Sequence, residues 1–232
     1  TALDHEQHLK GPDTPEAKAV LEKIDAIVGR LMAAEQKAHS NAVIALVSDH
    51  GFEPSRYALN LFRPFIDEGL IRLDRDGKIA SWQAMPWISG GSAAIVLAKP
   101  DDHALVARVT TLLDRLAANP ANGIARIADR HTIAQMSGNA QASFYLNLRP
   151  DFVTDIFRGA DAAIVGPAPV KGMHGYFPGP SNLQSTFMLL GKGVPAGKDL
   201  GQVDMRAIAP TLAEILRVSL PDAEEQAVAW RP

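Results

Sequence analysis

The sequence predicts an α/β fold with a mostly parallel sheet and a smaller α+β lobe inserted into it. A long helical pattern over residues 14–38 is followed almost directly by the continuous apolar run 42–47. That run is too short for a helix and does not alternate, which is typical of a strand covered on both faces. A helix followed by a doubly buried strand indicates an α/β domain.

The first helix is expected to begin at Thr14. Thr14 is a suitable N-cap, Pro15 suits the first helical position, and Glu16 lies in the first turn. Apolar side chains then recur at three- and four-residue spacing, which predicts one buried stripe. These residues are Val20, Ile24, Ile27, Val28 and Leu31.

The residues after the apolar run predict a helix and then a hairpin. Residues 57–68 are expected to form a helix that ends at Gly69. Residues 70–73 and 78–82 predict two strands, and an Asp-Gly turn within 74–77 joins them.

The middle of the chain has α+β character, which distinguishes it from the flanking segments. We expect strands at 92–97 and 144–148, with an amphipathic helix at 102–118 between them. The predicted division is therefore a core in two parts, residues 1–73 and 161–232, interrupted by an inserted cap or substrate lobe at 74–160.

Short apolar strands return after the predicted lobe, at 162–165 and 185–190, and a final amphipathic helix follows at 204–218. Asp204 is its expected N-cap, although Pro210 in the early turns allows a later start. Its inward face is predicted to carry Ile208, Leu212, Ile215 and Leu216.

Composition excludes several classes of protein. The net charge of −3 and the pI of about 6.1 provide no basic field for nucleic acid or an anionic membrane. No apolar run approaches the roughly 18 residues of a membrane span. Cysteine is absent, so neither disulfides nor thiolate metal sites exist. The absence of cysteine is consistent with a bacterial periplasmic or secreted protein. The chain starts at Thr1 without Met, and we expect further sequence upstream.

Asp49, His50 and Gly51 directly follow the predicted strand at 42–47. Ligands of open α/β sheets bind beyond the carboxyl ends of the strands. Neighbouring side chains of a strand point to opposite faces, but Gly51 permits a break at which two of them can converge. An Asp-capped turn with a solvated histidine is the equally simple alternative.

Asp4 and His8 form a second candidate pair. Their four-residue spacing places them on one face of a helical turn, where a carboxylate and an imidazole can bind a cation together. The zinc-protease signature HExxH is excluded, because His5 and His8 have one residue too few between them. A polar N-terminal tail is the alternative.

His174, which lies between Gly172 and Gly175, is a third candidate, and a solvated loop histidine is its alternative. The segment Ser89-Gly90-Gly91-Ser92 could bind a phosphate through backbone amides. No lysine follows it as in a P-loop, so a tight turn before the strand at 92 is favoured.

Together the candidates are two carboxylates and three imidazoles, expected at one edge of a parallel sheet. Oxygen and nitrogen ligands without thiolate suit zinc or another first-row divalent ion in a hydrolytic site. Five ligands are too many for one catalytic zinc and too few for two complete ones. The count indicates a two-metal site that lacks some ligands. The five are Asp4, His8, Asp49, His50 and His174.

The order of the segments DHEQHLKGP, VSDHGF and GMHGY resembles the type I phosphodiesterase/nucleotide pyrophosphatase branch of the alkaline phosphatase superfamily. In that family D-x-x-x-H-x-x-G-P supplies an Asp and a His to one zinc, and Asp4 and His8 match it. A strand-ending D-H-G supplies the second zinc, matched by Asp49 and His50. A later H-G histidine returns to the first zinc, matched by His174. The tail DMRAIAPTLAEIL also looks like the helix that closes these domains.

The resemblance implies an alkaline phosphatase-like α/β/α three-layer sandwich and two divalent ions, with zinc (Zn2+) expected. It implies hydrolysis of a small-molecule phosphate ester or nucleotide, not of a nucleic-acid polymer, and it favours a periplasmic or secreted location. The family's nucleophile, a Thr or Ser, and one further Asp ligand match nothing here and are expected upstream of Thr1. We therefore expect no catalytic nucleophile in this chain, which alone would be incomplete for catalysis.

Other readings of the resemblance stay open. One is a phosphomonoesterase or phosphonate hydrolase of the same superfamily, with the lobe at 74–160 setting the substrate. Another is a metal-binding pseudo-enzyme that lacks the nucleophile. Manganese is an alternative to zinc for the same ligands.

Overall fold

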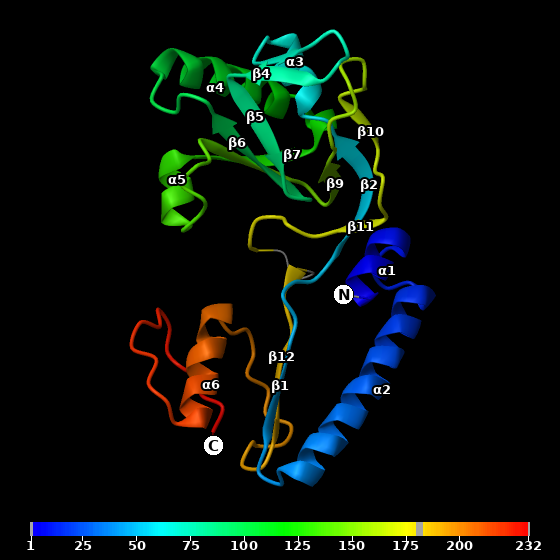
Figure 1. The fold of residues 1–232 in the computed structure, drawn as a ribbon, viewed down its shortest axis with the longest axis vertical. Helices are drawn as coiled ribbons and strands as arrows, with labels where there is room; N and C mark the ends of the chain where they lie inside the picture. The colour runs from blue at the N-terminus through cyan, green and yellow to red at the C-terminus, as the bar shows by residue number, and fades with distance from the viewer. Residues whose placement is uncertain (1, 180–182, 232) are drawn as a thin grey trace. The chain divides into compact units, whose positions relative to one another are not determined.

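The computed structural model describes residues 2–179 and 183–231, and these form two compact units (Figure 1). The first unit comprises Thr1–Leu21 and Gly51–Leu183, and the second comprises Glu22–His50 and Gln184–Pro232. The predicted insertion of a lobe at residues 74–160 stays a prediction. The division into two compact units does not test it, because a compact unit can contain both an inserted lobe and part of the core.

The first unit begins with α1 (Ala2–Lys10), followed by a turn into α2 (Pro15–Ala38). Gly11, with φ of +99°, makes this turn and donates its N–H to the Gln7 carbonyl at 2.9 Å. Thr14 caps α2 as predicted, because its Oγ1 accepts the Ala17 N–H at 3.3 Å.

A four-stranded antiparallel sheet forms one layer of the first unit, in the order β5-β6-β8-β7. The predicted strands at 92–97 and 144–148 are confirmed as β6 and β8. The sheet's strands are β5 (Ala84–Ile88), β6 (Ser92–Leu97), β8 (Phe144–Leu148) and β7 (Ile124–Asp129). α4 (His103–Ala118) packs on this sheet with its N-terminus capped by Asp102, which confirms the predicted helix (Figure 1). Two short helices, η1 (Pro120–Asn122) and α5 (Arg130–Gln135), flank β7.

A second group of strands surrounds β2 (Glu53–Leu59). β9 (Asp151–Thr154) pairs with it in parallel, and β10 (Val165–Pro167) and β11 (Gly172–Met173) pair with it antiparallel. The β2–β9 pair is the parallel one among the described strands. The expected mostly parallel arrangement is therefore not what the described strands show.

The predicted helix at 57–68 is wrong over its first residues. Tyr57, Ala58 and Leu59 continue β2, because they pair with β9 on one side and β10 on the other. Non-local strand pairing here overrides the local helical pattern. The helix itself is α3 (Phe62–Asp67), and Gly69 follows it with φ of +67°.

The predicted hairpin is confirmed as β3 (Ile71–Leu73) and β4 (Ile79–Trp82). Its turn accepts two backbone N–H groups on Asp74 Oδ1, from Asp76 and Lys78. The hairpin, α3 and α4 contribute to one apolar core of the first unit, whose fully buried members include Phe65, Leu70, Ile95, Leu113, Leu146 and Leu148.

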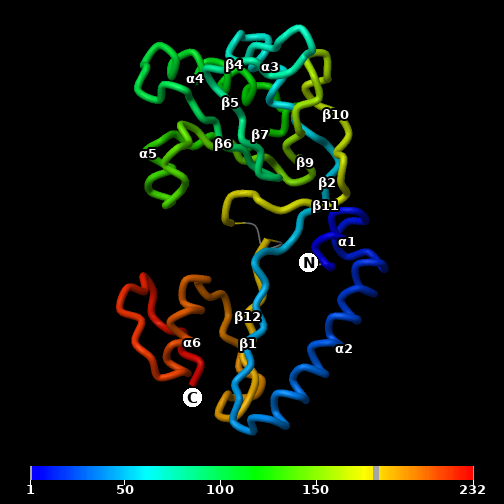
Figure 2. Tube along the Cα trace, viewed as in Figure 1, coloured from blue at the N-terminus to red at the C-terminus, as the bar shows by residue number. Residues whose placement is uncertain are grey.

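The second unit contains a two-stranded antiparallel sheet, β1 (Val43–Val47) with β12 (Phe187–Gly191) (Figure 2). The prediction that β1 is covered on both faces is wrong: four of its residues are half-buried and Val47 is 51% exposed. Among the described residues β1 pairs with β12 alone, and this narrow sheet shields little side-chain area.

The amphipathic helices also bury less than their patterns predicted. On α2, Val20, Ile24 and Val28 are half-buried, but Ile27 and Leu31 are exposed. The C-terminal helix begins as η3 (Met205–Ala207) and continues as α6 (Ile208–Leu216). Asp204 caps η3 as predicted, whereas the prediction of an inward Leu216 is wrong, since this residue is 71% exposed.

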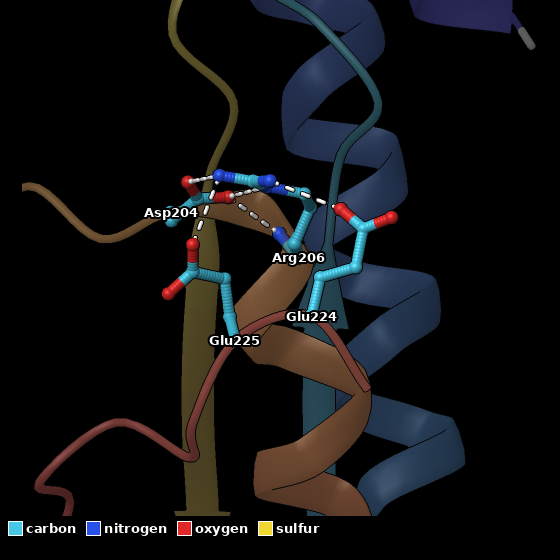
Figure 3. A network of polar contacts seen from close by, with 4 residues as sticks. All are labelled: Asp204, Arg206, Glu224 and Glu225. Atoms are coloured by element: carbon cyan, nitrogen blue, oxygen red, sulfur yellow. Dashed lines mark hydrogen bonds and ion pairs between the residues drawn. The ribbon is translucent and has the colours of Figure 1, made fainter. Parts of the chain in front are cut away.

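Arg206 joins the start of this helix to the C-terminal segment (Figure 3). Its guanidinium donates to Asp204 at 2.8 Å, to Glu224 at 3.0 Å and to Glu225 at 2.9 Å. The hydrogen bonds that the Arg206 side chain and backbone N–H donate to Asp204 lower the pKa of Asp204 to about 2. Nearby, Thr211 Oγ1 accepts the Val228 N–H at 3.0 Å, so the segment is held at two points.

No described helix combines the length and apolar character that a membrane crossing requires.

Candidate metal centre

The centre begins with one turn of α1. Asp4 and His8 are four residues apart on this helix, and their side chains lie on the same face. Asp4 Oδ1 is 3.6 Å from His8 Nε2. This juxtaposition follows the sequence expectation, and it arises from helical geometry alone.

The backbone of β11 sets the orientation of the His8 ring. His8 Nδ1 lies 2.9 Å from the Gly172 carbonyl oxygen, which can only accept, so Nδ1 carries the proton. His8 Nε2 then presents its lone pair on the side of Asp4. A histidine that ligates a metal is oriented in this way by a hydrogen bond from its second nitrogen.

His174 completes the cluster from 170 residues further along the chain. Its Nε2 is 3.7 Å from Asp4 Oδ1, and the ligand atoms of Asp4, His8 and His174 all lie within 4.8 Å of one another. Two ligands of a tetrahedral ion with bonds of about 2.0–2.2 Å are about 3.3–3.6 Å apart. The spacing and the nitrogen and oxygen donor set therefore fit a divalent ion such as zinc.

Phe52 forms an apolar wall against both imidazoles. Its ring centroid is 4.9 Å from that of His8 and 5.3 Å from that of His174, and both pairs are edge-to-face at 73°. Because Phe52 is only 7% exposed, its ring is held in place and restricts rotation of the two histidine rings that it contacts. In the sequence, the signal for this role is an aromatic residue directly after Asp49-His50-Gly51.

The Ser89-Gly90-Gly91-Ser92 segment is the tight turn that the sequence favoured, and it joins β5 to β6. The Ser89 N–H donates to the Ser92 carbonyl at 2.8 Å, and Gly90 has φ of +76°. The contacts of this turn with the His174 loop have no local signal in the sequence. The Gly91 N–H donates to the His174 carbonyl at 2.9 Å, and Ser92 Oγ donates to the Gly175 carbonyl at 2.6 Å.

The two glycines of this turn permit its close approach to the His174 loop. A Cβ on Gly91 would lie 2.2 Å from the Tyr176 ring, and one on Gly90 would lie 2.3 Å from the His174 carbonyl oxygen. Tyr176 is held in turn, because its hydroxyl donates to the Phe152 carbonyl at 2.8 Å. Burial, with a smaller effect from the nearby Glu53 carboxylate, raises the Tyr176 pKa well above its usual value and keeps this donor protonated.

Asp49 and His50 belong to the second unit and follow the end of β1 after one residue, Ser48. Asp49 Oδ2 is 3.5 Å from His50 Nε2, and Asp49 Oδ1 accepts the His50 N–H at 3.1 Å. The two adjacent side chains thus converge, as the expected break after the strand requires. The Asp49 side chain is 88% exposed. Of the five predicted ligands, the described structure gathers three in the first unit and pairs two in the second.

A family model described as type I phosphodiesterase/nucleotide pyrophosphatase matches residues 1–165. The chain belongs to this family. No match is found among curated protein sequences.

Solved structures of similar fold include human ectonucleotide pyrophosphatase/phosphodiesterase 5, at 17% identity and a TM-score of 0.67. The murine protein of the same name is 16% identical with a TM-score of 0.67, and one of its structures is an inactive form in complex with AMP. Each comparison covers 97% of this chain and 54% of the other. The chain thus spans about half the length of the structures that it matches. The likeness confirms the predicted alkaline phosphatase-like α/β fold.

Proposed function

We propose that the chain is part of a metal-dependent hydrolase of phosphoric esters, of the phosphodiesterase/nucleotide pyrophosphatase type. The observation that carries the proposal is the convergence of Asp4, His8 and His174, whose ligand atoms lie within 4.8 Å of one another. Membership of the family supports the same reaction class.

Asp4, His8 and His174 would hold one divalent ion, with zinc favoured by the two imidazoles and one carboxylate. Asp49 and His50 would hold a second. Bound ions of this kind supply Lewis acidity toward a phosphoryl oxygen and lower the pKa of a coordinated hydroxyl or water. The nucleophile would be a Thr or Ser that precedes Asp4 in the full-length protein. One further Asp, a metal ligand, would also precede Asp4.

The residues around the cluster would act by orienting its ligands. The Gly172 carbonyl keeps the proton of His8 on Nδ1, at 2.9 Å, so that Nε2 is available to a cation. Phe52 limits the rotation of both imidazoles and excludes water from one side of them. Together these contacts prepare the ligand set before an ion arrives, which reduces the ordering required on binding.

The substrate would be a small-molecule phosphate ester or a nucleotide. The AMP complex of the murine protein shows a nucleotide bound to a protein of the same fold. It supports, for this chain, the same chemical class of ligand.

The test is a substitution of His174 in the full-length protein. We expect His174→Ala to lose about one bound metal equivalent by elemental analysis and to lower the hydrolysis of a bis-aryl phosphate by about 100-fold or more, because loss of a residue that only orients a ligand already costs about 10–100-fold. The matched control is His103→Ala, which removes an exposed imidazole from the first turn of α4. Full metal content and full activity in His174→Ala would refute the proposal.

Parallel assays with a mono-aryl phosphate and a phosphonate ester separate the substrate classes. Faster turnover of the bis-aryl phosphate supports a phosphodiesterase, and faster turnover of either other ester contradicts that part of the proposal.

A further inference from the structure

A pocket of about 400 Å³ lies in the first unit, beside the junction of α1 and β11. This volume is within the range of small-ligand sites, about 300–1,000 Å³. Its lining includes three cationic side chains, Lys10, Arg56 and Lys171, and three prolines, Pro12, Pro54 and Pro167. None of the three ligands of the candidate metal centre lines it.

The charges of the pocket are unbalanced. Arg56 Nε lies 3.3 Å from Asp151 Oδ1, so one of the three cations has an anionic partner. Within the described residues Lys10 and Lys171 form no ion pair. Glu6 is one helical turn before Lys10 but does not reach it as an ion pair. The pocket therefore carries two ammonium groups in excess, and these favour an anion.

The walls provide few neutral hydrogen-bond donors. Proline has no N–H, and the Ser55 and Lys171 N–H groups are already bonded to the carbonyls of Lys171 and His8. The Ser55 hydroxyl donates to the Val170 carbonyl at 2.8 Å. Recognition would then depend on the cationic side chains, which suits a ligand with several charged oxygen acceptors.

The same backbone carries the pocket and the metal ligands. Lys171 donates its N–H to the His8 carbonyl at 2.8 Å, and Gly11 packs against Lys171, whose carbonyl oxygen would be 3.4 Å from a Cβ at Gly11. Lys10 is two residues from His8, and Lys171 is three residues from His174. An anion held by both lysines would draw these two segments together.

We propose that this pocket is a binding site for a phosphate-type oxyanion, outside the cluster of Asp4, His8 and His174. The oxyanion comes either from free inorganic phosphate or from the phosphate group of a nucleotide, since both offer the same charged oxygens. The ammonium groups of Lys10 and Lys171 bind it, with a contribution from the remaining guanidinium N–H groups of Arg56.

The test is isothermal titration calorimetry of the protein in a chelating buffer, so that no metal ion contributes. The titrants are inorganic phosphate, AMP and adenosine. We compare wild type with Lys10→Gln/Lys171→Gln and with Lys78→Gln/Lys99→Gln. The latter pair removes the same charge from two exposed lysines of the first unit. Thermal unfolding of all three proteins establishes that each is folded.

We expect the control variant to bind phosphate or AMP with the affinity of wild type. The Lys10/Lys171 variant should bind either ligand at least about tenfold more weakly than wild type. Tighter binding of AMP than of phosphate assigns the site to nucleotides, and equal binding assigns it to free phosphate. The proposal is overturned if both variants bind like wild type, if wild type shows no saturable binding up to about 10 mM, or if adenosine binds as tightly as AMP. Because the measurement involves no hydrolysis, its failure is separate from a failure of the proposed function.

Discussion

The backbone N–H of Gly91 donates a 2.9 Å hydrogen bond to the carbonyl of His174, a residue 83 positions later in the chain. Through this bond the β5–β6 turn supports the loop that brings His174 to Asp4. Gly91 has no side chain that could bind a metal or react. Its hydrogen bond to His174 instead makes the turn a positioning element for the candidate metal centre.

Gly91→Ala is expected to disturb this loop. The added Cβ would lie 2.2 Å from the Tyr176 ring, so the ring or the turn must move. Overpacking of this kind costs about 1–3 kcal/mol in the free energy of unfolding. We expect zinc to bind more weakly as well, because the displaced loop carries His174. Chemical denaturation measures the loss of stability, and zinc titration of the same protein measures the loss of affinity.

Gly166→Ala is the matched control, because a Cβ at Gly166 meets no atom within 4 Å. It should leave zinc affinity unchanged. An unaltered zinc affinity in a destabilised Gly91→Ala would contradict the positioning role and leave only a packing role.

Ser92→Ala tests the second hydrogen bond to the loop. The Ser92 hydroxyl donates to the Gly175 carbonyl at 2.6 Å, and the residue is buried. Its loss leaves that carbonyl without this donor and should cost about 1–2 kcal/mol of stability. Urea titration measures this loss as a lower unfolding midpoint. The control Ser81→Ala, at an exposed position of β4, should change the midpoint little. Equal midpoints for the two variants would exclude a contribution from the bond.

Phe52→Ala removes the wall behind both imidazoles. A buried phenylalanine truncated to alanine costs about 3–5 kcal/mol of stability, and here the two rings also gain freedom to rotate. We expect weaker zinc binding in addition to a lower unfolding midpoint. Phe52→Leu, which restores most of the volume, should recover stability more fully than zinc affinity. Equal recovery of the two would show that the wall acts by volume alone.

Asp204 predicts a dependence of stability on acid pH. Its pKa is lowered from 3.8 to about 2 by hydrogen bonds from Arg206, so the folded state favours the carboxylate. The stabilisation is present above pH 4 and should be lost as the pH falls from about 4 to about 2. Asp204→Asn should lose the part of the acid dependence that belongs to this residue, as followed by thermal unfolding across that pH range. An unchanged pH profile in the variant would contradict this assignment.

Local features of the sequence predicted those elements whose signals are local. Thr14 and Asp204 cap α2 and η3 as predicted, because a cap involves only the next three residues. The approach of Asp4 to His8 is likewise a consequence of one helical turn. The D-x-x-x-H-x-x-G-P, D-H-G and H-G segments, recognised by their order, identified the family that the comparison shows.

Contacts between distant segments were decided by the tertiary structure alone. Residues 57–59 extend a strand against their helical pattern because β9 and β10 pair with them, and both partners come about 100 residues later. The 3.7 Å between His174 and Asp4 likewise depends on distant segments: β11, which precedes His174, pairs with β2, and the glycine turn supports His174. Hydrogen bonds and packing between distant segments leave no local pattern in the sequence, such as a hydrophobic period or a capping residue. Only the folded chain therefore reveals which residues hold the candidate metal centre in place.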